Sequence, residues 1–227
     1  MKKIASFTLA LLTLVSCQFV SYSGNGGHKV YVSEGDEVTL SMDELKDFSS
    51  IEVNGYADVN FTQADSFKVE LTTNQDVVEK LDFHVKDGVL VLQTKEKVQI
   101  RKASIKVNVT APTLSKVTVN GAADFDLDAY NGSDALRVVV NGAGDIKIEN
   151  TNLAELSVEV NGAGDIDLKS INVNQLSVEV NGAGDAKISG IAQVADVKIS
   201  GAGDVDVRNL QCESLNTHKN GLGRIKR

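Results

Sequence analysis

Val160-Asn161-Gly162-Ala163-Gly164-Asp165 is the stretch of sequence that decides the fold of this 227-residue chain. The same six residues recur at 140–145 and 180–185, with variants at 119–124 and 199–204 and a shortened copy at 220–224. The first glycines of these copies, 19 to 21 residues apart, are Gly121, Gly142, Gly162, Gly182, Gly201 and Gly221. A nearly fixed period of this length is typical of a repeat architecture in which each unit stacks on the next.

Within one period, apolar residues alternate with polar ones on both sides of the glycine corner. Strict alternation places Leu156, Val158, Val160, Ile166 and Leu168 on one face of the flanking strands. Three short strands and three corners in about 20 residues match one coil of a parallel β-helix. An antiparallel meander would need a hairpin turn at both ends of every strand, whereas the glycine corner occurs once per period. The pattern therefore predicts an all-β, right-handed parallel β-helix-like solenoid, because parallel crossovers are almost always right-handed.

The N-terminal half of the chain is less regular. Val53-Asn54-Gly55-Tyr56-Ala57-Asp58 aligns without a gap with residues 119–124, so the motif first appears before the regular coils, which begin near Leu114. Between them the alternation continues without the signature. Asp87-Gly88, between two alternating apolar runs, predicts a β-hairpin.

The N-terminus has the features of an export signal. Lys2 and Lys3 precede an apolar stretch, residues 4–15, that is too short to span a bilayer. Leu14-Val15-Ser16-Cys17 resembles the lipobox of bacterial lipoproteins, and this resemblance implies lipid attachment to Cys17 and cleavage before it. The alternative is an ordinary signal peptide with an incidental cysteine. We expect a signal peptide over residues 1–16, a lipidated flexible tether over 17–29 and the solenoid over 30–227.

Composition and cysteine content exclude several classes of protein. The formal net charge is −8, and no basic run or aromatic platform appears, so we expect no nucleic-acid partner. After processing, Cys212 has no partner and the chain has no disulfide framework. Cys212 also lacks an evident histidine partner, so we expect a small core residue rather than a nucleophile.

Two rows of charge follow from stacking the periods. The outward residues after each corner alternate in sign along Asp126, Lys147, Asp167, Lys187, Asp206 and Lys226. Opposite charges facing each other across strands stabilise a sheet, so the alternation predicts in-register stacking. The alternative reading is solvated surface charge without pairing.

The aspartates of the corners form a row of one sign, which ends at Arg224. Their repulsion must be offset by backbone N–H groups of the glycine turn or by a bound calcium ion. We favour the backbone groups, because the denser nine-residue calcium repeat is missing, and we expect neither a metal nor another cofactor. Stacked asparagines would form an amide ladder. The corner residues to which we assign this structural role are Asn141, Gly142, Gly144, Asp145, Asn161, Gly162, Gly164, Asp165, Asn181, Gly182, Gly184, Asp185, Gly201, Gly203 and Asp204.

Together these features resemble the head GIN domain family of Bacteroidota, whose members are described as putative autotransporter adhesins. The resemblance covers about residues 40–227 and is carried by residues 48–53, residues 107–112 and the Gly-Ala-Gly-Asp series. It implies a binding protein and brings no catalytic residues with it. The chain departs from the series at Gly223-Arg224, where the last corner has no aspartate.

The sequence predicts a non-enzymatic lipoprotein of the outer membrane, held by its lipid, whose solenoid binds a protein or a glycan. A periplasmic structural or scaffold lipoprotein is the first alternative, because Gln18-Phe19-Val20 lacks the acidic run of a surface-export signal. A carbohydrate-active β-helix enzyme is the second, although His28, His84 and His218 are scattered and the chain has no tryptophan. The sequence leaves the ligand and the oligomeric state open, and Glu159 and Glu179 are the first place to look for a partner.

Overall fold

A computed structural model describes residues 22–23, 29–95, 98–132 and 134–227. These residues form 19 strands and one short 3-10 helix, η1 (Val78–Lys80), and no α-helix is present in them. Cys17, the expected signal peptide and most of the expected tether lie outside the described residues.

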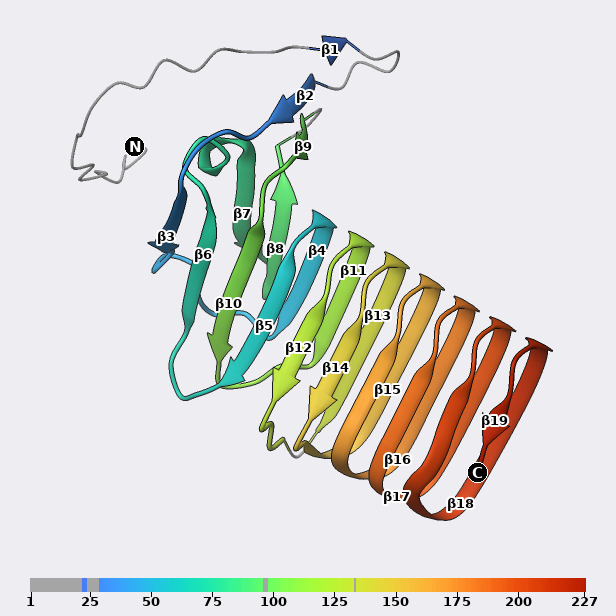
Figure 1. Ribbon diagram of the computed structural model, residues 1–227. Coiled ribbons are helices and arrows are strands. Elements are labelled where there is room, and N and C mark those ends of the chain that lie inside the picture. The colour runs from blue at the N-terminus through green and yellow to red at the C-terminus, as the bar shows by residue number, and fades with distance from the viewer. Residues whose placement is uncertain (1–21, 24–28, 96–97, 133) are drawn as a thin grey trace.

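The regular part of the chain is a stack of coils with two walls, joined at one end by the glycine corner (Figure 1). One wall contains the whole of β4 (Ser50–Tyr56), β11 (Lys116–Ala122), β13 (Ala135–Ala143) and β15 (Asn152–Ala163). It also contains the later parts of three long strands, β16 (Ile166–Ala183), β17 (Ala186–Ala202) and β18 (Val205–Leu222). The other wall contains the early parts of the same three long strands and β5 (Asp58–Gln63), β12 (Phe125–Asp128), β14 (Ile146–Glu149) and β19 (Ile225–Lys226).

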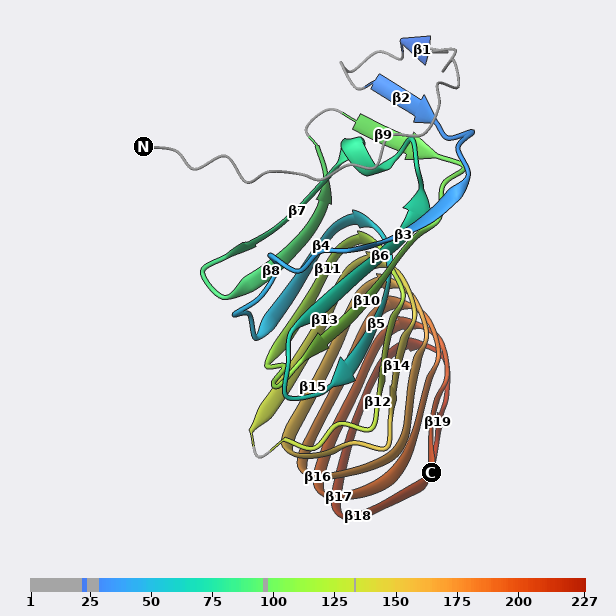
Figure 2. The ribbon, with the colours of Figure 1, turned by 90° about the vertical axis from the view of Figure 1, so that its left-hand side faces the viewer.

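Neighbouring coils pair in parallel and in register with the sequence repeat. Val160 lies opposite Val140 on one side and opposite Val180 on the other. Seen from the N-terminal end, the chain rises along the first wall, turns at the corner and descends the second wall while moving away from the viewer (Figure 2). This clockwise path makes the solenoid right-handed, as the sequence predicted.

The three corners of each coil are visible in the burial pattern of β16. Buried and exposed side chains alternate, except at Lys169-Ser170 and Asn174-Gln175, where two consecutive residues are exposed. Each such slip turns the strand while keeping apolar residues inward. The two slips and the glycine corner are the three corners expected from the repeat, although the strand continues through the two lower ones.

The core fills the space between the two walls. Val160 from one wall and Leu168 from the other have no exposed surface, and the inward residues around them are equally buried. Fully burying a side chain of this size contributes about 1.5–3 kcal/mol. Because every coil repeats this arrangement, the core runs along the stack without a break.

The N-terminal strands extend the stack in an order that differs from the sequence. After β5, the chain runs to the far end of the stack and passes through β6 (Lys68–Asn74) and β7 (Leu81–Lys86). It returns through β8 (Val89–Thr94) and β10 (Ile105–Ala111), which pair in parallel with β4 and β5. The chain then crosses to β11, on the opposite side of β4. The early motif copy therefore stacks directly on its later relative, with Asn54 opposite Asn120.

Antiparallel strands finish the N-terminal end. β7 and β8 form the predicted hairpin, whose turn residues Asp87 and Gly88 have φ of 51° and 76°. Two positive φ values are typical of a type I′ turn, whose backbone twist matches that of the two flanking strands. β3 (Glu37–Ser41) pairs antiparallel with β6 and is one edge of the large sheet, and β7 is another. A small separate sheet contains β1 (Tyr22–Ser23), β2 (Lys29–Val32) and β9 (Val98–Arg101).

Candidate functional site

The glycine corner is the tightest place in the coil. Gly162 has a φ of 149°, and a Cβ atom there would lie 1.9 Å from the carbonyl oxygen of Gly142. A Cβ on Gly164 would lie 2.1 Å from the carbonyl oxygen of Gly144. Backbones of successive coils therefore touch at the corner, and only glycine permits this approach at both positions and the backbone angle of Gly162.

The asparagines form the amide ladder that the sequence suggested. The side-chain Nδ2 of Asn161 donates to Oδ1 of Asn141 at 3.1 Å, and Asn181 donates to Asn161 at 3.0 Å. The ladder continues through Asn120 to Asn54, and Ser200 takes the next position beyond Asn181. Each of these amides is therefore hydrogen-bonded to the amides of the neighbouring coils.

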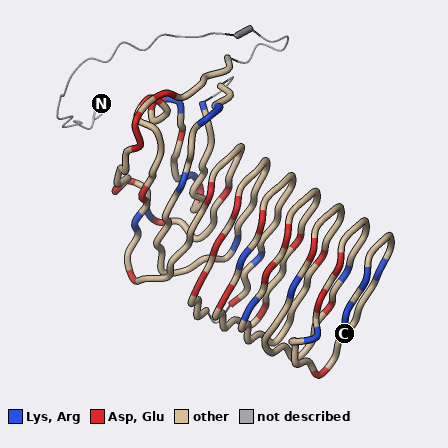
Figure 3. Tube along the Cα trace, in the orientation of Figure 1, with Lys and Arg blue, Asp and Glu red and all other residues tan. Residues whose placement is uncertain are grey.

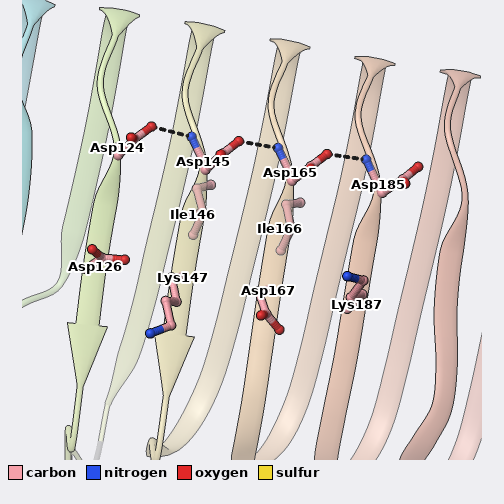
Figure 4. A pocket seen from close by; sticks show the side chains of 10 residues that line it. All are labelled: Asp124, Asp126, Asp145, Ile146, Lys147, Asp165, Ile166, Asp167, Asp185 and Lys187. Atoms are coloured by element: carbon pink, nitrogen blue, oxygen red, sulfur yellow. Dashed lines mark hydrogen bonds between the residues drawn. The ribbon is translucent and has the colours of Figure 1, made fainter.

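The corner aspartates are bonded between coils (Figure 4). Oδ1 of Asp145 accepts the backbone N–H of Asp165 at 2.8 Å, and Oδ1 of Asp165 accepts that of Asp185 at 2.8 Å. The same contact runs from Asp124 to Asp145, from Asp185 to Asp204 and from Asp204 to Arg224. The carboxylates accept backbone N–H groups as expected. However, each donor belongs to the next coil and not to the aspartate's own turn, because in-register stacking places that N–H directly beside the carboxylate.

The pKa values at the two ends of this row differ. Asp58, the first member, has its pKa raised by burial and then by the adjacent Asp124. At the other end, the pKa of Asp204 is lowered, chiefly by a hydrogen bond from Lys226 at 2.9 Å. Repulsion along the row is therefore relieved where the basic C-terminal coil begins.

A shallow groove of about 380 Å³ lies along this wall. Its lining comes from successive coils and consists of Asp124, Asp126, Asp145, Ile146, Lys147, Asp165, Ile166, Asp167, Asp185 and Lys187. The aspartates point along the stack and do not converge on one point (Figure 4). Within the residues that the structure describes, no group of three or more His, Cys, Asp or Glu side chains is placed to hold a metal ion.

The alternating row beside the corner is in register, but its charges pair elsewhere. Asp126 faces Lys147, which faces Asp167, as predicted. Among the described residues, however, no ion pair within 4.0 Å joins two members of the row. The close contacts are Lys147 to Glu149 at 3.3 Å, Lys226 to Asp204 at 2.9 Å and Arg208 to Asp206 at 2.6 Å.

Side-chain length explains these alternative pairs. An aspartate carboxylate stays close to the sheet, while the lysine and arginine heads extend to partners on their own strand or diagonally across. Arg208, two residues after Asp206 on the same strand, lowers the pKa of that carboxyl group to about 2. The predicted cross-strand pairs are therefore wrong in detail, although the register that they implied is confirmed.

The glutamate pair on the opposite wall is better balanced than the sequence suggested. Glu159 accepts from Arg137 at 2.6 Å and from Asn161 at 2.9 Å. Glu179 accepts from Asn181 and faces Lys198 on the next coil. Cations on both sides of the pair therefore reduce the excess negative charge that had marked it as a binding position.

The described histidines, His84 on β7 and His218 on β18, lie on strands at opposite ends of the stack. His84 contacts Asp82 at 3.3 Å on the hairpin, His218 is exposed on the last coil, and His28 lies outside the described residues. Cys212 is a free thiol on β18 and packs half-buried against the core. Its inward position agrees with the sequence, and its partial exposure follows from its place in the last coil.

Sequence reasoning missed Asp76, which attaches residues 31–34 to the solenoid. Its carboxylate accepts the Tyr31 hydroxyl at 3.0 Å, the Ser33 hydroxyl at 2.8 Å and the Glu34 backbone N–H at 3.0 Å. Burial raises its pKa, but these bonds and one from Gly35 lower it below the ordinary value. No motif surrounds Asp76 in the sequence, so only the fold reveals this role.

Comparisons with known proteins agree with this architecture. The sequence model of a family described as "Putative auto-transporter adhesin, head GIN domain" matches residues 47–226. No curated protein matches the chain. The crystal structure of a putative adhesin from Bacteroides fragilis NCTC 9343 has a TM-score of 0.69 at 19% identity, covering 86% of this chain and 99% of that one.

Two further crystal structures show the same fold. A putative adhesin from Parabacteroides merdae ATCC 43184 has a TM-score of 0.54 at 17% identity and covers 87% of this chain and 99% of its own. A putative lipid binding protein from Parabacteroides distasonis ATCC 8503 has a TM-score of 0.55 at 18% identity, with coverages of 88% and 100%. At these identities the likeness concerns the fold alone. In the part of the chain that is described, no helix is long and apolar enough to cross a membrane.

Proposed function

Because the chain belongs to the head GIN domain family, we propose that it is a cell-envelope lipoprotein that binds a ligand and does not catalyse a reaction. In this proposal Cys17 carries the lipid, residues up to about 29 form the tether, and the solenoid presents the binding surface of an adhesin. The ligand is a protein or a glycan.

The distribution of polar groups along the stack carries this proposal. Both walls present rows of polar side chains that repeat from coil to coil, and the groove beside the corner follows the same direction. A hydrolase or lyase of carbohydrates needs an acid and a base that converge on one bond. Here Asp145 and Asp165 are each held by a backbone N–H of the next coil, which is a structural use of a carboxylate. A long repetitive face suits an extended partner.

Location separates an adhesin from a periplasmic scaffold lipoprotein, which would have the same fold. Intact cells are treated with a protease and the solenoid is followed with an antibody. Digestion on intact cells supports the adhesin, whereas protection until the outer membrane is opened supports the scaffold. Fatty-acid labelling of the wild type and of Cys17→Ala tests the anchor, and labelling that survives the substitution contradicts it.

Matched variants show which wall binds. The purified chain and two variants are applied to immobilised glycans and extracellular proteins. Glu159→Gln with Glu179→Gln changes one wall, and Asp126→Asn with Asp167→Asn changes the other, and both keep side-chain shape. We expect one pair to weaken binding of a captured ligand and the other pair to leave it unchanged. Equal binding by all three proteins would contradict recognition through these polar rows.

A further inference from the structure

The two ends of the solenoid are finished differently. At the N-terminal end, Leu45, Phe48 and Val77 close the core, each with no more than 4% of its surface exposed. At the other end, β18 has a full neighbour on one side only, namely β17, and β19 covers just its first two positions. The apolar residues at this end that stay only half-buried are Leu210, Cys212, Leu215 and Ile225. This end therefore leaves apolar surface that a further layer would cover.

Both ends also present a strand edge of the same sheet. The path of the large sheet runs from β3 to β7, which are both edge strands at the N-terminal end, and β17, β18 and β19 continue it from β16 to the other end. β3 is antiparallel to β6, which is antiparallel to β10, and β10 is parallel to β5 and to the strands beyond it. β3 and β19 therefore run in the same direction. An added strand can use the free N–H and C=O groups of an open edge.

The charges of the two edges are opposite (Figure 3). Residues 34–47, which contain β3, include six acidic side chains and one lysine. Residues 216–227 include four basic side chains and no acidic one, in a chain whose net charge is −8. The exposed members of the two sets include Asp36 and Glu37 at one end and Lys219 and Arg224 at the other.

We propose that the solenoid associates end to end, with the basic edge β18–β19 of one copy docking on the acidic edge β3 of a second copy. Charge decides which ends meet, because two basic ends repel each other and so do two acidic ends. Lysine and arginine at an edge prevent contact between like ends, which is a common protection of open strands. The contact joins different surfaces, so it does not close on itself and leads to linear assemblies. This inference is independent of the proposed ligand binding.

Sedimentation velocity of the full chain tests the proposal, with Cys17→Ala in every sample so that no lipid contributes. At low salt we expect the mean sedimentation coefficient to rise with protein concentration. At about 0.5 M salt we expect a single monomer, because screening then acts within a few ångströms. A monomer at every concentration in low salt would overturn the proposal.

Charge reversal identifies the ends that meet. In Asp36→Lys with Glu37→Lys the net charge of residues 34–47 changes from −5 to −1, and in Lys219→Glu with Arg224→Glu that of residues 216–227 changes from +4 to 0, so each variant keeps only one strongly charged end. Each should remain monomeric alone, and a 1:1 mixture should associate again. Lys187→Glu, in the middle of the wall, is the matched control and should associate like the wild type. Circular dichroism and melting confirm that every variant is folded.

Three further outcomes would count against the proposal. Association that survives the β3 reversal but is lost with the β18–β19 reversal would show contact between two C-terminal ends and overturn the proposal. Association that survives both reversals would place the contact elsewhere, with the same consequence. Failure of the two folded variants to associate when mixed would show that complementary charge does not drive the contact.

Discussion

The regular coils from β11 onward and the N-terminal strands before them share one core but are specified in different ways. In the coils each residue faces its equivalent, so one unit of sequence defines the contacts of all the others. In the N-terminal region each contact occurs once, as in the packing of Phe48 on Phe67 with ring centres 5.1 Å apart. Repetition therefore gives the coils a common register, whereas single contacts fix the order of the strands that close the stack.

The largest effect should come from a deletion in the regular coils that breaks their common register. Removal of residues 142–161 joins equivalent positions and keeps every inward residue inward. Removal of residues 142–151 places a corner against a strand and breaks the pairing. We expect the first protein to melt cooperatively at a modestly lower temperature and the second not to fold. Circular dichroism and calorimetry measure this, and equal melting temperatures would contradict the coil register.

The next largest effect on stability should come from a single glycine-to-alanine substitution, compared between two copies of the corner. In Gly162→Ala the new Cβ meets the Gly142 carbonyl oxygen at 1.9 Å, so we expect a loss of about 3 kcal/mol or more. In Gly55→Ala nothing lies within 4 Å of the Cβ, and only the φ of 127° opposes the substitution. We expect about 1 kcal/mol there. Urea denaturation compares the two, and similar losses would show that backbone strain rather than contact between coils dominates.

The regular coils could be predicted from the sequence because their information is local and repeated. Leu156, Val158 and Val160 alternate, and Gly162 recurs once per turn, so period, register and hand all follow. The order of the N-terminal strands could not be predicted, since no sequence pattern in β8 or β10 indicates that these strands stack outside β4 and β5. The position of Asn54 beside Asn120 was accessible only because both belong to the motif.

Side-chain partners on the surface were less predictable than the backbone register. The row of Asp126 and Lys147 was in register, yet Lys147 pairs with Glu149 on its own strand. Equivalent positions follow from the repeat, whereas the reach of a long side chain depends on neighbours that the repeat does not fix. The direction of the aspartate bonds, from one coil to the next, likewise depends on how the corners stack.

Asp76→Ala should loosen the attachment of residues 29–34 and leave the coils intact. The substitution removes the acceptor for Tyr31, Ser33 and Glu34, and Ser33 is buried. Leaving a buried donor unsatisfied costs about 1–3 kcal/mol. We expect faster amide hydrogen exchange over residues 29–34 and unchanged protection in β15 and β16. Loss of protection throughout the coils would show that the two regions are not independent.

The same carboxylate predicts a pH dependence. The pKa of Asp76 is lowered in the folded protein, so its contribution is fully present above the ordinary aspartate pKa of about 3.9. The contribution is lost as the pH falls through the lowered folded value. Protection of residues 29–34 should therefore decrease in that acidic range in the wild type and not in Asp76→Asn. A segment that is released equally in both proteins would contradict this role.

The smallest effects on stability should come from substitutions of the aspartates of the corner row. Asp165→Asn keeps an oxygen that can accept the Asp185 N–H, so we expect a change below about 0.5 kcal/mol. At Asp58 the folded pKa is raised, so the stability that this group contributes declines as the pH rises through that value. Asp58→Asn should therefore raise the melting temperature slightly at neutral pH.

Chelation distinguishes a row of backbone acceptors from a row of metal ligands. If each carboxylate is held by a backbone N–H, EDTA should leave the melting temperature of the wild type and of Asp165→Asn unchanged. If calcium bridged Asp145, Asp165 and Asp185, its removal would leave unpaired charges about 5 Å apart and lower the melting temperature by several degrees. Recovery on adding calcium, together with loss of that response in Asp165→Asn, would make the corner a metal site. If the melting temperature does not change, the carboxylates serve as acceptors for the backbone of the next coil, and a ligand must then be sought on the outward faces of the walls.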